Sequence, residues 1–101
     1  MIDLNAIEGF DWDAGNARKN EKHGVSQAEA EQIFFNEPLI IVEDEKHSHN
    51  EERYQALGKT NDGRLLHTTY TLREHRSKIR IISARPMAAR ERKIYEAEIH
   101  S

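Results

Sequence analysis

The sequence contains no cysteine, which excludes disulfide bonds and thiolate metal sites. It also lacks any apolar stretch close to the roughly 20 residues needed to cross a bilayer. Its first thirty residues have neither the basic start nor the apolar run of a signal peptide. We therefore expect a cytoplasmic protein with no membrane partner.

Familiar catalytic motifs are missing as well: there is no GxSxG, no glycine loop that cradles phosphate, and no HExxH. His47 and His49 bracket one serine, but a structural zinc site usually needs four ligands, so we expect no metal and no cofactor. Chemistry that needs only a base, an acid and a cation stays compatible. RNA cleavage is the clearest example, because the 2′-hydroxyl is an internal nucleophile.

What the chain does contain suits one small domain spanning residues 1–101, since a second core would leave each half too small. Its charge is unevenly placed. Residues 1–52 hold 13 acidic and 4 basic side chains, a net of −9, whereas residues 53–101 hold 5 acidic and 11 basic, a net of +6. Despite the overall charge of −3, the second half can meet a polyanion.

The N-terminal half predicts two helices and a strand. The first helix runs from Asp13 to His23 and stops at Gly24. The second begins at Ser26, which forms a capping-box pattern with Glu29, and ends before Pro38. Its stripe of Ala30, Ile33 and Phe34 predicts one packed face. The aliphatic run of residues 39–42 predicts a strand entering the core, and residues 43–52 an exposed loop.

The C-terminal half predicts a hairpin, a further strand and a helix. Strands over residues 52–60 and 64–72 flank the turn signal Asn61-Asp62-Gly63. Strict alternation over residues 78–85 predicts that Ile79, Ile81, Ser83 and Arg85 share one face. In the final helix, residues 87–99, the packing candidates are Met87, Ile94 and Tyr95.

Residues 73–93 carry the densest charge, with eight basic and two acidic side chains, a pattern typical of phosphate binding. A solvated helix face beside an edge strand is an equal alternative. Arg85 closes an apolar strand, where its fork of donors suits a phosphate or a pentacovalent phosphorus centre. An ion pair with Glu91 or Glu52 is compatible with that role. Helix capping alone explains Lys22 and His23, and His67 is more typical of a packed histidine than of a catalyst.

Four stretches, in this order and spacing, resemble the BrnT family of toxins from bacterial type II toxin–antitoxin systems: FDWDAGNARKNEKHGVS, EQIFFNEP, EERYQALGKTNDGRLLHTTYT and IRIISARPMAARERKIYE. The resemblance implies a RelE-like α+β fold, with a small antiparallel sheet of three to five strands, two N-terminal helices and a C-terminal helix. It also implies a metal-independent endoribonuclease and a cognate ribbon-helix-helix antitoxin, with operator DNA bound only through the antitoxin complex.

Carried over motif by motif, the resemblance implies Arg85 as the transition-state cation and His23 or Glu91 as the group for proton transfer. Tyr95 either orients the substrate or packs. The implied substrate-binding residues come from the family's motifs and from the basic segment: Lys22, Arg53, Arg80 and Arg92.

Two departures from the family pattern stand out: His67 replaces a residue that is more often apolar, and Pro86-Met87 replaces a basic residue and an alanine. The rival interpretation is therefore a non-catalytic module that binds an antitoxin or nucleic acid. A small enzyme for another phosphodiester is a third. Exposed apolar groups around the second helix and residues 39–42 are candidates for antitoxin docking.

Overall fold

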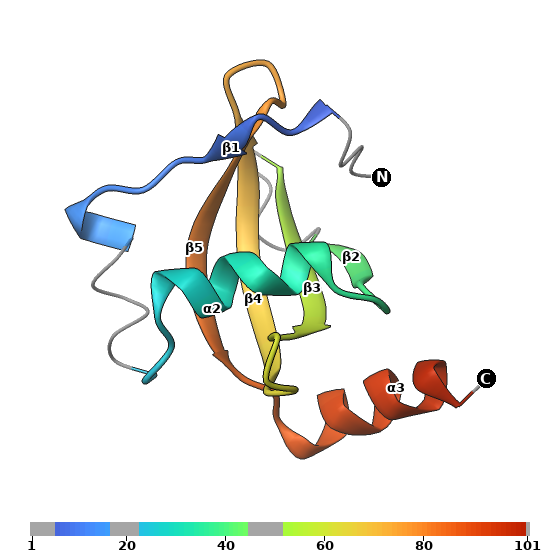
Figure 1. Ribbon diagram of the computed structural model, residues 1–101. Coiled ribbons are helices and arrows are strands. Elements are labelled where there is room, and N and C mark those ends of the chain that lie inside the picture. Colours follow the sequence, from blue (N-terminus) through green and yellow to red (C-terminus); the bar gives the residue numbers. More distant parts are fainter. Residues whose placement is uncertain (1–5, 17–22, 45–51, 101) are drawn as a thin grey trace.

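The computed structural model describes residues 6–16, 23–44 and 52–100, which form an α+β fold with one five-stranded sheet (Figure 1). The fold class is as expected. Along the chain the elements are β1 (Gly9–Phe10), α2 (Gln27–Gln32), the 3-10 helix η2 (Ile33–Phe35), β2 (Ile40–Asp44), β3 (Arg53–Lys59), β4 (Leu65–Arg73), β5 (Lys78–Pro86) and α3 (Ala89–Ile99).

The strand order is β1-β5-β4-β3-β2, and the four longer strands pair antiparallel, as predicted. The sheet as a whole is mixed, because β1 joins β5 in parallel through Gly9 and Phe10. A two-residue strand is too short to show a sequence pattern. Of the first predicted helix, residues 14–16 are helical and His23 lies in a turn, whereas residues 17–22, including Lys22, lie outside the described residues. Residues 45–51 of the predicted loop lie outside them as well.

Helix α2 begins as the sequence predicts. The Ser26 hydroxyl accepts from the Glu29 backbone N–H at 3.1 Å, and the Glu29 carboxylate accepts from the Ser26 N–H at 3.1 Å. These contacts satisfy N–H groups that have no partner inside the helix. In Figure 1 the helix crosses one face of the sheet. At Gly58 a Cβ would lie 2.8 Å from the Ile33 Cβ, so glycine allows η2 to approach β3 closely.

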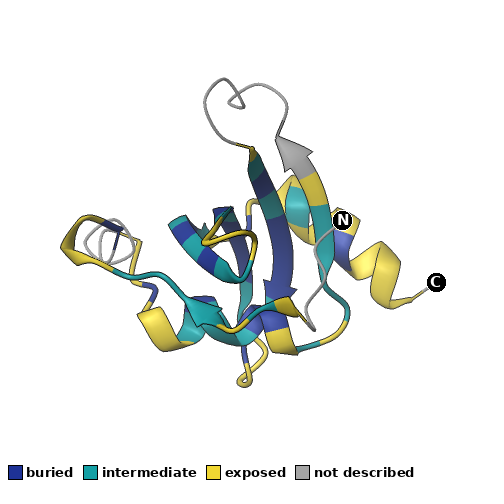
Figure 2. Ribbon diagram, turned by 90° about the horizontal axis from the view of Figure 1, so that it is seen from above, coloured by how far each residue is buried: buried dark blue, intermediate teal, exposed yellow. Residues whose placement is uncertain are grey.

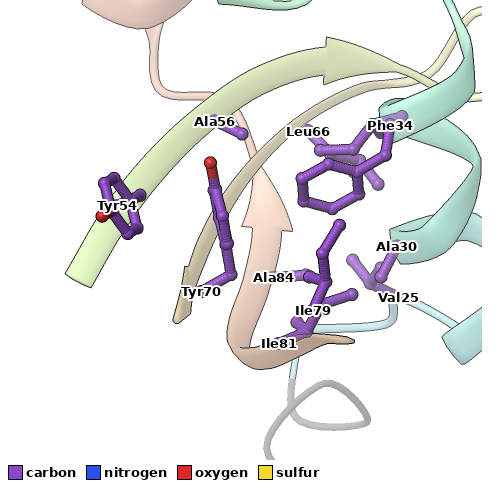
Figure 3. Close-up of a cluster of buried hydrophobic side chains, with 11 residues drawn as sticks. Val25, Ala30, Phe34, Tyr54, Ala56, Leu66, Tyr70, Ile79, Ile81 and Ala84 are labelled. Carbon is purple, nitrogen blue, oxygen red and sulfur yellow. The ribbon is translucent and has the colours of Figure 1, made fainter. Parts of the chain in front are cut away.

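The main core lies between α2 and the sheet (Figure 3). The Phe34 ring meets Tyr70 edge-on at 5.1 Å between centroids, and Tyr70 stacks on Tyr54 at 5.4 Å. The predicted helix stripe is confirmed, because Ala30, Ile33 and Phe34 are all buried. Figure 2 shows the buried residues concentrated in the central strands. The face of the sheet opposite α2 is called the second face below.

β4 alternates regularly, whereas the alternation predicted for β5 is wrong. Leu66, Tyr70 and Leu72 of β4 lie in or against the main core. In β5 the register shifts, since Thr69 pairs with Ser83 while Tyr70 pairs with Ile81, which leaves Ile82 as an extra residue. A bulge of one residue reverses the alternation beyond it. Ala84 therefore joins the core, and Arg85 lies on the second face, not on the face of Ile79 and Ile81.

A smaller cluster holds α3 against the second face: Leu57, Met87 and Tyr95, with Ile40 and Leu65 packed around them. The Tyr95 hydroxyl donates to the Pro38 carbonyl at 2.6 Å. Packing is confirmed for Met87 and Tyr95 but not for Ile94, which is 48% exposed. The strand over residues 39–42 exists as β2. It is an edge strand, however, and Val42 is 54% exposed where a core residue was expected.

Candidate functional site

Arg85 and Glu91 form an ion pair on the second face. The bulge in β5 brings the Arg85 side chain to this face, and the first turn of α3 supplies Glu91. Arg85 Nη1 lies 2.7 Å from Glu91 Oε1 and Nη2 lies 2.8 Å from Oε2, a two-pronged ion pair. The side chains are 37% and 20% exposed. This confirms the expected ion pair and places a fixed cation where a ligand can reach it.

The pair has a clear electrostatic consequence. The Arg85 guanidinium, helped by the Ala88 backbone N–H, lowers the pKa of Glu91 to about 2, against the desolvation that burial imposes. In turn, the Glu91 carboxylate raises the pKa of Arg85. Glu91 is therefore ionised at neutral pH, cannot donate a proton there, and is a weak base.

His67 is the residue of this site that the sequence did not reveal. In the register of β4 and β5 it is paired directly with Arg85, and it is 7% exposed. Its Nε2 lies 3.3 Å from Gln55 Oε1 and 3.8 Å from Glu91 Oε2. The sequence signal that could have placed it is the alternation of β4, which puts His67 on the same face as Leu65 and on the face opposite to Leu66. Pairing with Arg85 depends on the bulge, which the sequence pattern does not show.

Two further predicted arginines lie on the second face. Arg53 begins β3, and its Nε is buried without a hydrogen-bond acceptor among the described residues. Arg80 pairs with Thr71 in the sheet, and its Nη2 lies 2.9 Å from Asp13 Oδ2 while Nη1 lies 3.5 Å from Asp11 Oδ2. The structure thus brings Arg53, Arg80 and Arg85 to one face, although strict alternation had separated the last two.

The structure does not bring the remaining predicted residues that it describes into contact with the Arg85–Glu91 pair. Tyr95 is fully buried and contacts the Pro38 carbonyl, which supports packing and not substrate contact. His23 is exposed and lies in the turn before α2. Arg92 is exposed on α3, where its Nη1 donates to the Met87 carbonyl at 2.9 Å. Lys22 lies outside the described residues.

Within residues 6–16, 23–44 and 52–100, no group of three or more histidine, aspartate or glutamate side chains is placed to hold a metal ion. His47 and His49 lie outside those ranges. None of the described helices is long and apolar enough to span a membrane.

A wide groove lies away from this site. It has a volume of about 1050 Å³ and runs between η2, β2 and the end of α3, and Phe35, Leu39, Ile41 and Ile99 are among its lining residues. Phe35 is 75% exposed, and Val42 on the neighbouring edge strand is 54% exposed. Both residues lie in the segments whose exposed apolar groups are candidates for antitoxin docking.

The sequence model of a family described as "Ribonuclease toxin, BrnT, of type II toxin-antitoxin system" matches residues 12–91. That range includes both ends of the Arg85–Glu91 pair and all of the sheet except β1. A search of curated proteins found no match.

Proposed function

The chain belongs to the BrnT family of ribonuclease toxins of type II toxin–antitoxin systems, and we propose that it cuts RNA without a metal, with Arg85 stabilising the transition state. The single observation that carries the proposal is the position of Arg85. Its guanidinium is fixed by Glu91 on a face that also presents Arg53 and Arg80.

In the proposed reaction the 2′-oxygen of a ribose attacks the adjacent phosphorus, and the 2′-hydroxyl gives its proton to a base. The bond between phosphorus and the 5′-oxygen of the next nucleotide breaks, and that oxygen takes up a proton. The products are a 2′,3′-cyclic phosphate and a free 5′-hydroxyl. Negative charge gathers on the phosphoryl oxygens in between, where a cation that is already oriented stabilises it most.

Arg85 is equipped for this task. Three of its five N–H donors are engaged, two with Glu91 and one with the Pro86 carbonyl at 3.2 Å. Among the described residues, the other two donors have no acceptor, so they are available to phosphoryl oxygens. Glu91 orients the fork in this proposal, because both of its oxygens already hold Arg85.

Proton transfer then falls to His23, the other residue expected to perform it. Arg64 Nη1 donates to the Gly24 carbonyl at 2.8 Å, which fixes the neighbouring turn beside the start of β4. This is also the end of the sheet where β5 finishes, because Leu66 pairs with Pro86. A substrate that extends around this end would meet both His23 and Arg85. Phosphates farther along would contact Lys22, Arg53, Arg80 and Arg92.

The cationic character of this face supports metal independence. We further propose that the partner is a ribbon-helix-helix antitoxin and that operator DNA is bound only by the complex. The sequence resemblance supports that part of the proposal. Purification of the toxin with the product of an adjacent reading frame would test it.

The decisive experiment incubates purified protein with a defined single-stranded RNA in excess chelator and identifies the end groups. We expect a 2′,3′-cyclic or 3′-phosphate end, and a loss of about 10²- to 10³-fold in rate for Arg85→Ala. Arg85→Lys keeps the charge but loses the fork, so it should recover part of the rate.

Arg76→Gln is the matched control, since Arg76 is paired with Glu52 and lies in the turn between β4 and β5, at the other end of β5 from Arg85. RNA carrying 2′-deoxyribose at the cut site should resist cleavage. Metal-dependent cleavage, or full activity in Arg85→Ala, would contradict the proposal. Binding without cleavage at every pH would instead indicate a non-catalytic module.

A further inference from the structure

His67 lies inside the candidate site, yet the proposed reaction does not use it. It has neighbours on β3, β5 and α3. Arg85 faces it from β5 and Glu91 from α3, while β3 contributes Leu57 as its cross-strand partner and the neutral Gln55. The charged groups around the imidazole include the Arg85 guanidinium and the Glu91 carboxylate.

The geometry determines what the imidazole does. Its Nε2 faces two oxygen acceptors, Gln55 Oε1 at 3.3 Å and Glu91 Oε2 at 3.8 Å. A nitrogen between two acceptors carries hydrogen, so Nε2 is the donor in the neutral ring as well as in the imidazolium. Protonation therefore adds a positive charge to the ring without changing the direction of this contact.

Of the three ionisable groups in the cluster, His67 is the one whose type changes charge between about pH 5 and 8. Glu91 stays ionised in this range, because its pKa is about 2, and Arg85 stays protonated. Among Arg85, Glu91 and His67, a change of charge in this range therefore arises at His67.

We propose that His67 is a positioning residue for the Arg85 phosphate site and makes the affinity for RNA depend on pH. In its protonated form the imidazolium attracts Glu91 Oε2, which steadies the Arg85 fork, and adds a second cation beside the bound phosphate. In its neutral form it keeps the hydrogen bond to Gln55 and loses the attraction to Glu91. The inference rests on the proposed function, since it concerns the same phosphate site.

The test measures binding of a single-stranded RNA with 2′-deoxyribose at every position, which cannot be cut, from pH 5.5 to 8.5. For the wild-type protein we expect affinity to fall about three- to tenfold across this range, the size expected for one charge several ångströms from a phosphate in a partly exposed site. His67→Gln keeps a donor near Nε2 and does not titrate, so its affinity should stay close to constant.

His100→Gln is the matched control, because it removes an exposed histidine beyond the end of α3. It should reproduce the wild-type pH profile. In cleavage assays with ordinary RNA, His67→Gln should change the pH dependence of KM and leave that of kcat as it is. Thermal unfolding of His67→Gln checks that the fold is unchanged.

A wild-type pH profile in His67→Gln, with cleavage intact, would overturn this inference and leave the ribonuclease proposal standing. Failure of the wild-type protein to bind or cut RNA at any pH would overturn the proposed function and this inference with it. A loss of affinity in His67→Gln that is the same at every pH would reduce His67 to a structural role and would also overturn it.

Discussion

At the scale of single residues, Glu91 makes the stability of the fold depend on pH. Arg85 lowers its pKa to about 2 from an ordinary value of 4.5. Between these two values the unfolded chain binds the proton and the folded chain does not, so acid favours unfolding. The contribution of Glu91 is complete above about pH 4.5 and is lost as the pH falls to about 2. We expect Glu91→Gln to lower the free energy of unfolding by about 1 kcal/mol at pH 6, a modest figure because Arg85 is partly exposed.

Urea unfolding of the wild-type protein and Glu91→Gln from pH 2 to pH 7 would measure this effect. The difference between the two should shrink towards zero in acid. Glu96→Gln changes an exposed carboxylate of the same helix and should match the wild-type protein at every pH. A stability difference for Glu91→Gln that does not vary with pH would show that the ion pair is not its source.

Part of the site could be predicted from residue types alone. An arginine at the end of a strand and a glutamate in the first turn of the next helix are six positions apart, so their pairing follows from local geometry. His67 could not be placed in the same way. Its contact with Glu91 needs the pairing of β4 with β5 and the docking of α3, and neither can be derived from neighbours in the sequence.

At the scale of elements, the predictable parts are those whose signal is local. The capping box at Ser26 fixes the start of α2, and Gly63, with φ of +85°, closes the hairpin between β3 and β4. The bulge at Ile82 has no such signal, because isoleucine suits either a regular strand or a bulged one. One extra residue nevertheless moved Arg85 from the expected face to the opposite one.

Helix α3 depends on Tyr95 for its attachment. The ring is fully buried and its hydroxyl donates to the Pro38 carbonyl at 2.6 Å. We expect Tyr95→Phe to lower the free energy of unfolding by about 1 kcal/mol, the usual net value of one hydrogen bond. Because Tyr95 supports the site and does not touch substrate in our proposal, the rate of RNA cleavage should stay within about twofold. Urea unfolding and the cleavage assay measure the two effects.

Tyr95→Leu, which removes the ring as well, should cost more stability than Tyr95→Phe and should loosen Glu91, which begins the same helix. A large loss of cleavage in Tyr95→Phe without a loss of stability would return Tyr95 to a catalytic role. The sequence resemblance alone left that alternative open.

At the scale of the whole molecule, the net charge of −3 conceals a separation of charge between two faces. The second face presents Arg53, Arg80 and Arg85, whereas α2 on the other side carries Glu29 and Glu31. The opposite signs of the two halves of the sequence already indicated this arrangement. Which basic residues act together could not be read from the chain, because the fold and not sequence distance brings β3 and β5 to one face.

The separation predicts how salt affects RNA binding. Each phosphate neutralised on a single strand contributes about −0.7 to the slope of log affinity against log salt concentration. Arg53→Gln should therefore make the slope less steep by about 0.7. Arg80→Gln should change it less, because Asp11 and Asp13 already neutralise part of its charge. Arg64→Gln, on the α2 side, should leave the slope unchanged. Titration of labelled deoxy-substituted RNA from 50 to 300 mM salt would measure all three, and equal slopes for Arg53→Gln and the wild-type protein would remove Arg53 from the RNA path.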